Sequence, residues 1–204
     1  MYWVLMLFLM GQDPTSSFNP VVPIEPASWL RSEDYPINAL RYEMSGVSKT
    51  EIFVGVDGRP QACYVVESSG SPDLDAMTCA AAIRRGKYKP ATDGTGKPMH
   101  GMARYNAAWR IIGERLGEVP ADVTLSASTL PDGRQSARVA LKYIVDEAGR
   151  IINCAVTDSS GSAKLDDLAC RAMPQRYTFA PARDKAGKAW QVVRTQSVAF
   201  ELSR

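Results

Sequence analysis

The chain contains one stretch of sequence twice. Residues 61–79 read QACYVVESSGSPDLDAMTC, and residues 152–170 read INCAVTDSSGSAKLDDLAC. A shift of 91 positions aligns the two copies without a gap, and the match continues to the Gly-Lys pairs at 96–97 and 187–188. A period of this length exceeds the units of solenoid proteins, which are about 20–50 residues long, and predicts two tandem small domains.

Each copy is expected to form two strands, a helix and a last strand. In the first copy, apolar residues alternate along TEIFVGV at 50–56, DGR at 57–59 signals a turn, and residues 61–67 return as the second strand. The second copy repeats this pattern in ARVALKYIV, EAGR and IINCAVTD. Alternating apolar residues predict the last strands at 102–111 and 192–202.

A helix is expected after each SSG sequence. Ser71 is a candidate N-cap with Pro72 at the first helical position, and apolar residues follow at intervals of three and four. The matching helix of the second copy contains Pro174, which predicts that it is shorter or kinked. Pro36 is expected to open one further helix before the first copy, whereas residues 119–133 carry no helical pattern. Each copy is therefore predicted to be a small α+β domain, an antiparallel sheet with a helix on one face.

The four cysteines occupy equivalent places in the two copies. One cysteine of each copy lies on the predicted second strand, and the other lies sixteen positions later on the predicted helix. A bridge that closes a loop of about 15 residues contributes about 3 kcal/mol, which is substantial for a small domain with a thin core. Four reduced thiols are the alternative, and the repeated spacing disfavours bridges between the copies without excluding them. The favoured pairs are Cys63 with Cys79 and Cys154 with Cys170.

The chain begins with ten apolar residues, MYWVLMLFLM. As a helix they would span about 15 Å, half of a hydrocarbon core of about 30 Å, so their length matches a signal-peptide core better than a membrane span. We expect residues 1–11 to be an export signal or a truncated anchor, and residues 12–33, which contain four prolines, to be a linker. The two domains are then expected at 34–115 and 116–204.

Composition argues against several classes of function. The formal net charge is +2 and the basic residues are dispersed, so no nucleic-acid footprint is present. A single histidine, His100, and the absence of a Cys-x-x-Cys pair leave no zinc site with the usual spacing. Paired serines before a helix are typical of turns and caps, and DGTGK at 93–97 lacks the spacing of a phosphate-binding loop. We therefore expect no catalytic activity, no metal and no cofactor.

The sequence resembles the C-terminal domain of TonB, the periplasmic energy transducer, in both copies. The resemblance covers residues 34–112 and 136–203 and implies two three-stranded antiparallel sheets, each packed by one or two helices, in the periplasm. The segments that carry it are DYPINA at 34–39, the stretch at 46–75, RRGKYKPA at 84–91, the stretch at 139–167 and RYTFAPA at 176–182.

The resemblance also implies how the protein binds its partners. Domains of this family add a short segment of an outer-membrane receptor as a strand to the edge of their sheet, where free backbone groups provide affinity. The family uses the last strand of the domain. The residues expected to meet the partner are Met102, Arg104, Asn106, Ala108 and Arg110 in the first copy, and Val193, Thr195, Ser197 and Ala199 in the second.

The chain departs from a complete transducer at its N-terminus. It has ten apolar residues in place of a full membrane helix, and its proline-containing segment at 13–26 reaches only about 45 Å when extended. The hypothesis is a non-catalytic periplasmic protein that binds receptor segments in energy transduction for transport. If an anchor was lost upstream, association with the inner membrane and its motor proteins is expected as well. The alternative is a structural, envelope-anchoring protein with blocked sheet edges. Open edge strands would also allow a homodimer.

Overall fold

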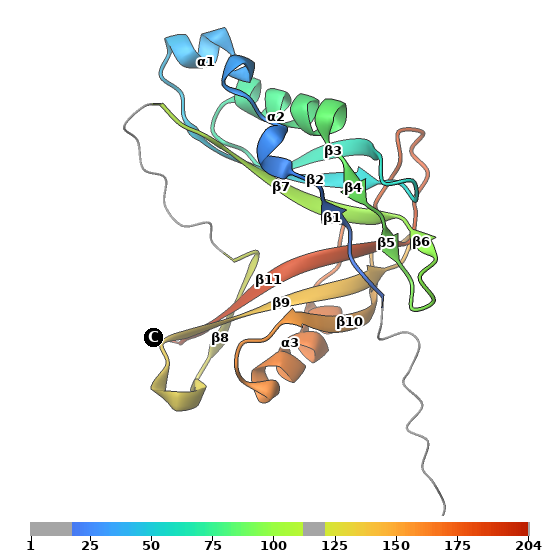
Figure 1. The fold of residues 1–204 in the computed structure, drawn as a ribbon. Coiled ribbons are helices and arrows are strands. Elements are labelled where there is room, and N and C mark those ends of the chain that lie inside the picture. Colours follow the sequence, from blue (N-terminus) through green and yellow to red (C-terminus); the bar gives the residue numbers. More distant parts are fainter. Residues whose placement is uncertain (1–17, 112–120, 204) are drawn as a thin grey trace, which may run out of the picture.

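The computed structural model describes residues 18–111 and 121–203 (Figure 1). The predicted segment 1–11 and the first part of the predicted linker lie outside the described residues. The first copy contains α1 (Ile37–Arg41), β2 (Gly46–Val54), β3 (Pro60–Glu67), α2 (Pro72–Arg85) and β7 (Gly101–Trp109). The second contains β8 (Val123–Ala127), β9 (Ser136–Val145), β10 (Ile151–Asp158), α3 (Ala163–Arg176) and β11 (Val192–Leu202).

Short elements complete the chain around these two units. The short strand β1 (Val22–Pro23) pairs with β4 (Tyr88–Lys89), and β5 (Ala91–Thr92) pairs with β6 (Pro98–Met99). Three single-turn 3₁₀ helices lie at Pro26–Ser28, Ser32–Asp34 and Pro131–Gly133. In the described part of the chain, no helix has both the length and the apolar character needed to cross a bilayer.

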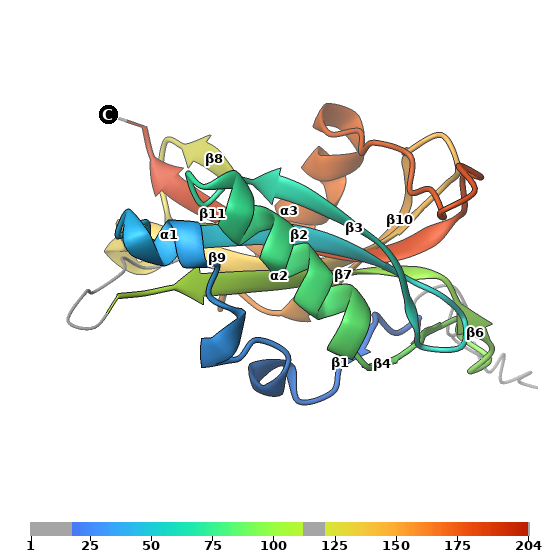
Figure 2. The same cartoon turned by 90° about the horizontal axis from the view of Figure 1, so that it is seen from above.

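Each unit has the predicted three-stranded antiparallel sheet. In the first, β2 lies between β3 and β7, and in the second, β9 lies between β10 and β11. Helix α2 packs against β2, β3 and β7, and α3 packs against β9 and β10, so the two helices lie on the outer sides of the molecule (Figure 1). The view from above in Figure 2 shows α2 running across the strands of its own unit.

The two units are joined into one sheet rather than separated by a linker. The strand order is β10-β9-β11-β7-β2-β3, with β8 on the side of β11. The junction is one parallel pair, Val193 with Gly101, and the Val193 N–H donates to the His100 carbonyl at 3.1 Å. Phe53 and Met102 of the first unit are buried in the core of the second. The predicted α+β class is confirmed, and the two units share their packing.

A glycine allows the two units to meet. At Gly101, an added Cβ would overlap the side chain of Val21 and would lie 3.3 Å from the carbonyl oxygen of Val193. The contact with Val21 is closer than real Cβ contacts, so a side chain here would displace Val21, whereas the Val193 carbonyl would have to move by a few tenths of an ångström. The absence of a side chain at residue 101 therefore lets both the N-terminal segment and β11 pack closely against β7.

The segment before the second copy forms a strand that the sequence pattern did not predict. Residues Val123–Ala127 run parallel to Val198–Leu202 as β8, along the side of β11 that faces away from β9. Tertiary pairing stabilises this conformation, because the free N–H and C=O groups of β11 provide hydrogen-bonding partners and because Val123, Leu125 and Ala127 pack against the core of the second unit.

Of the two predicted effects of Pro174, a shorter or a kinked helix, the shortening is wrong. Both α2 and α3 contain 14 residues, and Pro174 lies inside α3 two residues before its end at Arg176. Proline removes the hydrogen bond from its own nitrogen to the carbonyl four residues earlier. Because only the last turn follows it, the helix loses one bond and keeps its length.

The cysteines lie where strand and helix meet in each unit. Cys63 on β3 is bonded to Cys79 on α2, and Cys154 on β10 is bonded to Cys170 on α3. The Cα atoms are 5.5 Å and 5.6 Å apart, within the usual range for disulfides. This is the pairing that the repeat predicts, and each bond ties the outer strand of its unit to the helix.

The repeated SSG sequence is explained by an aspartate that follows it. Asp75 accepts hydrogen bonds from the Ser68 hydroxyl at 2.5 Å and from the Ser69 N–H at 2.9 Å. Asp166 accepts the same two bonds in the second unit, from Ser159 and Ser160. Ser71 is the N-cap residue, as predicted, but its side chain makes no capping bond. The aspartate of the first helical turn instead holds the loop that enters the helix.

We predict that removing either disulfide lowers stability without changing the fold. The variants C63A/C79A and C154A/C170A should each lose about 3 kcal/mol of unfolding free energy, because a closed loop of this size restricts the unfolded chain. Urea denaturation of the oxidised protein and of both variants measures this loss. Equal unfolding midpoints for all three proteins would contradict the assignment.

We also predict that acid weakens the two serine–aspartate contacts. Burial raises the pKa of Asp75 and of Asp166, but the hydrogen bonds from the preceding serines outweigh it and lower both pKa values overall. A lowered folded pKa gives stability that is complete above the unfolded pKa of about 3.9 and is lost as the pH falls through the folded value.

The substitution D75N should therefore cost about 1–2 kcal/mol at pH 7, and the difference from the unsubstituted protein should shrink below about pH 3. Thermal denaturation across the pH range provides the measurement. The matched control is D73N, since Asp73 is exposed in the same helical turn. An effect of D73N as large as that of D75N would argue against the contact.

Candidate partner-binding edge

The two predicted edge strands differ in the structure. β11 pairs with β9 along Val192–Glu201, with β8 along Val198–Leu202 and with β7 at Val193. It is therefore an inner strand of the sheet, and the prediction that it forms an open edge is wrong. β7 pairs with β2 along its whole length, but on its other side it meets β11 only at Gly101.

The backbone of β11 has almost no free groups on the predicted side. Successive residues of a strand point their N–H and C=O groups to opposite sides. Since the N–H of Val193 faces β7, the groups of Thr195, Ser197 and Ala199 face the same way. Ser197 is bonded to Asp122, whose carboxylate accepts from its N–H at 2.6 Å, and Ala199 lies in the pairing with β8. Thr195 alone has no strand opposite it.

The backbone of β7 remains open over three residues. The carbonyl of His100 faces β11, so by the same alternation the N–H and C=O groups of Arg104, Asn106 and Ala108 point away from β2. No strand within residues 18–111 and 121–203 pairs with them on that side. These six groups form a row that another chain can join as a strand.

The other two predicted residues of this strand have different positions. Met102 is 3% exposed and packs in the core that the two units share, so its side chain cannot contact a partner. Arg110 is exposed and lies one residue beyond the end of β7 at Trp109. The open edge of β7, defined as Arg104–Ala108, is therefore shorter than the predicted strand.

Two cavities flank the open edge of β7. One, of about 370 Å³, lies between the two units and is lined by Arg104 and Asn106 together with residues of the second copy such as Phe179 and Gln196. The other, of about 520 Å³, lies between Arg104–Ala108 and the segment Pro23–Leu30. A strand at this edge would thus lie in a groove with a wall on each face of the sheet.

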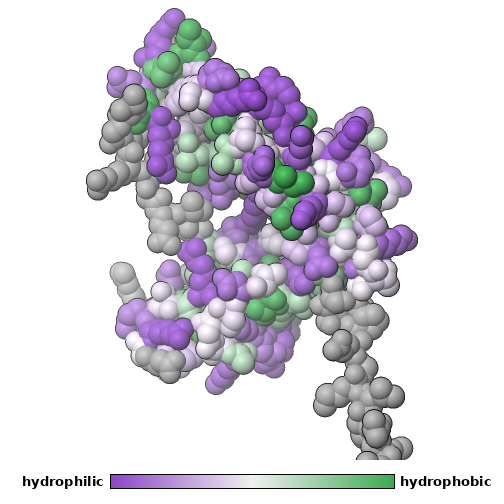
Figure 3. Space-filling view, in the orientation of Figure 1, coloured by the Kyte–Doolittle hydropathy of each residue, from purple (hydrophilic) through white to green (hydrophobic). Residues whose placement is uncertain are grey.

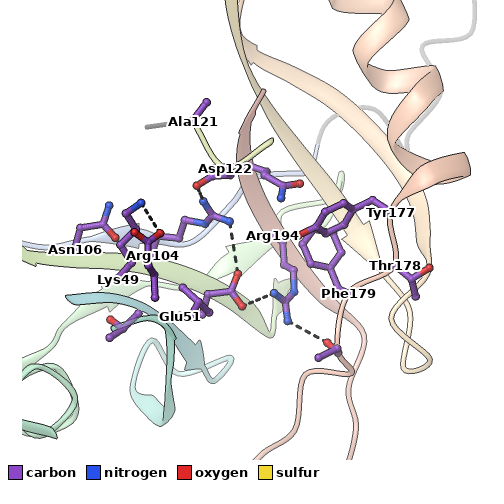
Figure 4. A pocket seen from close by; sticks show the side chains of 15 residues that line it. Lys49, Glu51, Arg104, Asn106, Ala121, Asp122, Tyr177, Thr178, Phe179 and Arg194 are labelled. Atoms are coloured by element: carbon purple, nitrogen blue, oxygen red, sulfur yellow. Dashed lines mark hydrogen bonds and ion pairs between the residues drawn. The ribbon is translucent and has the colours of Figure 1, made fainter. Parts of the chain in front are cut away.

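The cavity between the units contains a network of ion pairs (Figure 4). Arg194 of β11 donates to Glu51 of β2 at 2.5 Å, and Arg104 of β7 pairs with Asp122 and, at 3.8 Å, with Glu51. Arg194 also lies 4.6 Å from the centre of the Phe179 ring. Glu51 and Arg104 belong to the first copy and the other residues to the second, so the network links the two units.

The central residues of the network are buried. Arg194 is 4% exposed and Glu51 is 9% exposed. Burial lowers the pKa of the Arg104 guanidinium, the nearby Glu51 raises it and Arg194 lowers it further. Each buried charge therefore needs its partner, because an unpaired ion inside a protein costs several kcal/mol. Arg104, which was expected to meet the partner, is thus half-buried in this network.

The sequence contains one indication of this network, which is a difference in charge between the two copies. A shift of 91 positions places Lys142 opposite Glu51 and Thr195 opposite Arg104, so the copies differ in charge where the network lies. Lys142 instead donates to the carbonyl of Phe18 at 2.5 Å. Positions at which a repeat changes charge are therefore candidates for contacts between the copies.

His100 and the paired serines make contacts within the fold. His100 lies between two aromatic rings, with centroids 5.3 Å from Phe53 and 4.3 Å from Trp190. Burial lowers the pKa of the His100 imidazole. The serines of both SSG sequences bond to Asp75 and Asp166. Across the described ranges, no three His, Cys, Asp or Glu side chains are grouped so that they could hold a metal ion.

The face of the molecule drawn in Figure 3 carries no broad apolar patch. Hydrophobic side chains occur there in small groups between hydrophilic ones. A partner of this face would therefore bury little contiguous apolar surface.

Comparison with known proteins identifies both units. A family model described as the C-terminal domain of the Gram-negative bacterial TonB protein matches residues 31–111 and again residues 132–202, together well over half of the chain. That family is a non-enzymatic, transport-associated domain. No curated protein and no solved structure gives a significant match.

We predict that breaking the ion pair between the units destabilises the protein. E51Q leaves the Arg194 guanidinium buried without its counter-charge and should cost about 3 kcal/mol or more, as measured by urea denaturation. The matched control is E67Q. The Glu67 side chain is 61% exposed and pairs with Lys49 at 2.7 Å, so its loss should cost at most about 1 kcal/mol. Equal losses for the two variants would show that the pair contributes no more than a surface contact.

Proposed function

The chain belongs to the family of Gram-negative bacterial TonB C-terminal domains, with two copies in tandem, and we propose on this premise that it is a non-catalytic periplasmic protein that binds extended segments of TonB-dependent outer-membrane receptors. The segment joins the sheet as an added strand at the open edge of β7. In this role the protein takes part in energy transduction for transport.

The unpaired backbone of β7 is the observation that carries the proposal. Arg104, Asn106 and Ala108 present their N–H and C=O groups on the side away from β2, where no described strand pairs with them. Edge strands that are not used are commonly covered, twisted away or blocked by charge. Here a groove accompanies the open edge instead, with a cavity on each face of the sheet.

Of the two last strands, only β7 has an outer side that a segment can join, because that of β11 is closed. β8 covers the second half of its outer side and Asp122 binds Ser197. The two copies therefore have different roles in the proposal: the first binds the segment, and the second provides one wall of the groove. Association with inner-membrane motor proteins, and pairing of two chains at β7, remain further proposals.

A structural, envelope-anchoring role is the second candidate, and the closed edge of β11 is the observation that favours it. A protein that only bridges partners has no need of free backbone groups. Binding of receptor segments at β7 distinguishes the two functions, because the structural role leaves this edge unused.

We predict that receptor segments perturb the amide resonances of β7. Synthetic peptides that cover the plug segments of TonB-dependent receptors, long enough to pair about six residues, should shift the NMR signals of Arg104, Asn106 and Ala108. The resonance of Thr195 on β11 should shift less. If no peptide shifts the β7 signals, or if the peptides bind elsewhere, the proposal fails.

The substitution A108P tests the mode of binding. Proline removes the outward N–H of residue 108 and keeps the ladder bonds to β2, which involve its neighbours. Affinity should fall about 10-fold or more, since one hydrogen bond is lost and the ring obstructs the edge. The matched variant A108T retains the N–H and should bind within about 3-fold of the unsubstituted protein. Thermal denaturation confirms that both variants are folded.

A further inference from the structure

The open edge of β7 separates two cavities of different chemistry. Trp109 donates to Thr78 of α2, so the odd-numbered side chains of β7 lie on the helix face of the sheet. Met102 packs in the core of the second unit, so the even-numbered side chains lie on the opposite face. The side chains of an added strand would alternate between these two faces in the same way.

The cavity on the helix face is largely apolar. Pro23, Pro26, Ala27 and Leu30 form one wall, and Tyr105 and Ala107 of β7 line the other side. No charged side chain other than Arg104 lines this cavity. It therefore suits apolar side chains at alternate positions of a bound segment.

The cavity between the units has balanced charges. Its basic and acidic side chains form ion pairs across it: Arg194 with Glu51, Arg104 with Asp122, and Lys49 with Glu67. An additional charged side chain would enter this space without a partner of opposite charge, and desolvation would make that costly.

The hydrogen bonds of the same cavity are not balanced. Among the buried side-chain atoms of the described residues that lack a hydrogen-bond partner are Nε of Arg104, Nε of Arg194 and Oε1 of Gln196, all from residues that line it. Arg194 and Gln196 are 4% and 3% exposed. The lining residues thus hold two unused donors and one unused acceptor, each with less than 1 Å² of accessible area, so a bound side chain reaches them only by displacing the atoms that now cover them.

We infer that the cavity between the units binds the carboxamide side chain of an asparagine or glutamine in the added strand. A carboxamide accepts hydrogen bonds through its oxygen and donates through its nitrogen, and it carries no charge. Its oxygen is the acceptor that an arginine Nε–H lacks, and its nitrogen is the donor that Gln196 Oε1 lacks. The inference rests on the proposed function, and it adds the class of sequence that is bound: apolar residues on the helix face and a carboxamide on the other.

The second copy gains a role from this inference. Arg194 and Gln196 both belong to β11, whose own edge is closed, and Asp122 comes from the segment just before β8. The duplicated unit therefore selects the side chain that the first unit presents to it. Binding and selection are divided between two copies of one fold.

A host peptide tests the inference. It alternates valine and threonine between soluble ends, and one cavity-facing threonine is replaced in turn by Asn, Gln, Asp, Lys or Ala. The guest residue is moved through successive cavity-facing positions so that the register need not be known. Calorimetry should give the tightest binding for Asn or Gln at one position. The affinity should be about 10-fold higher than that of the Ala peptide and at least about 10-fold higher than those of the Asp and Lys peptides.

The outcomes separate the two proposals. Equal affinity for all guests, with shifts of the β7 amides, would overturn the carboxamide site and leave strand addition in place. Tightest binding of Asp or Lys would overturn it as well. Failure of every peptide to bind at β7 would overturn both proposals.

A substitution in the second copy provides an independent check. Q196M keeps the length of the side chain and removes the acceptor, so the preference for Asn over Ala should fall from about 10-fold to less than about 3-fold. The matched control is Q191M, because Gln191 lies in a different pocket beside Trp190. It should leave the preference unchanged. A Q196M protein that retains the full preference would contradict the site, provided that its NMR spectrum shows a native fold.

Discussion

The contact between β7 and β11 determines how much of the backbone is free on the outer sides of these two strands. It consists of one parallel pair, Val193 with Gly101, where residue 101 has no side chain to displace Val21 or the Val193 carbonyl. Beyond this point the two strands separate, and the buried pair of Glu51 and Arg194 holds the units together. If the strands stayed parallel and paired along their length, β7 would have no open edge.

The two copies therefore share a fold and differ in what surrounds it. Each has a central strand between two antiparallel partners, a helix of 14 residues and a disulfide from outer strand to helix. The difference lies in the segments before them. Val123–Ala127 pairs with the last strand of the second copy, whereas the segment Pro23–Leu30 forms a wall beside β7 without pairing with it. As a result, the outer side of β11 is closed and that of β7 is open.

The features that repeat in the sequence act locally within each unit. The cysteine pair ties the second strand to the helix, and the aspartate of the first helical turn holds the serines that precede it. Both contacts join residues close in sequence, so the same residues produce the same geometry twice. The central ion pair of the network, Glu51 with Arg194, joins residues 143 positions apart, and the described residues contain no second copy of it.

The sequence by itself determined the duplicated α+β unit, its strands and helix, both disulfide pairs and the strand β7 on which the candidate edge lies. These follow from alternation and spacing, which depend on neighbours along the chain. The tertiary structure alone decided that β11 is an inner strand, that Val123–Ala127 becomes β8 and that Arg104 turns into a buried network. The physical reason is that a backbone edge is open or closed according to what packs beside it, and that partner comes from a distant part of the chain.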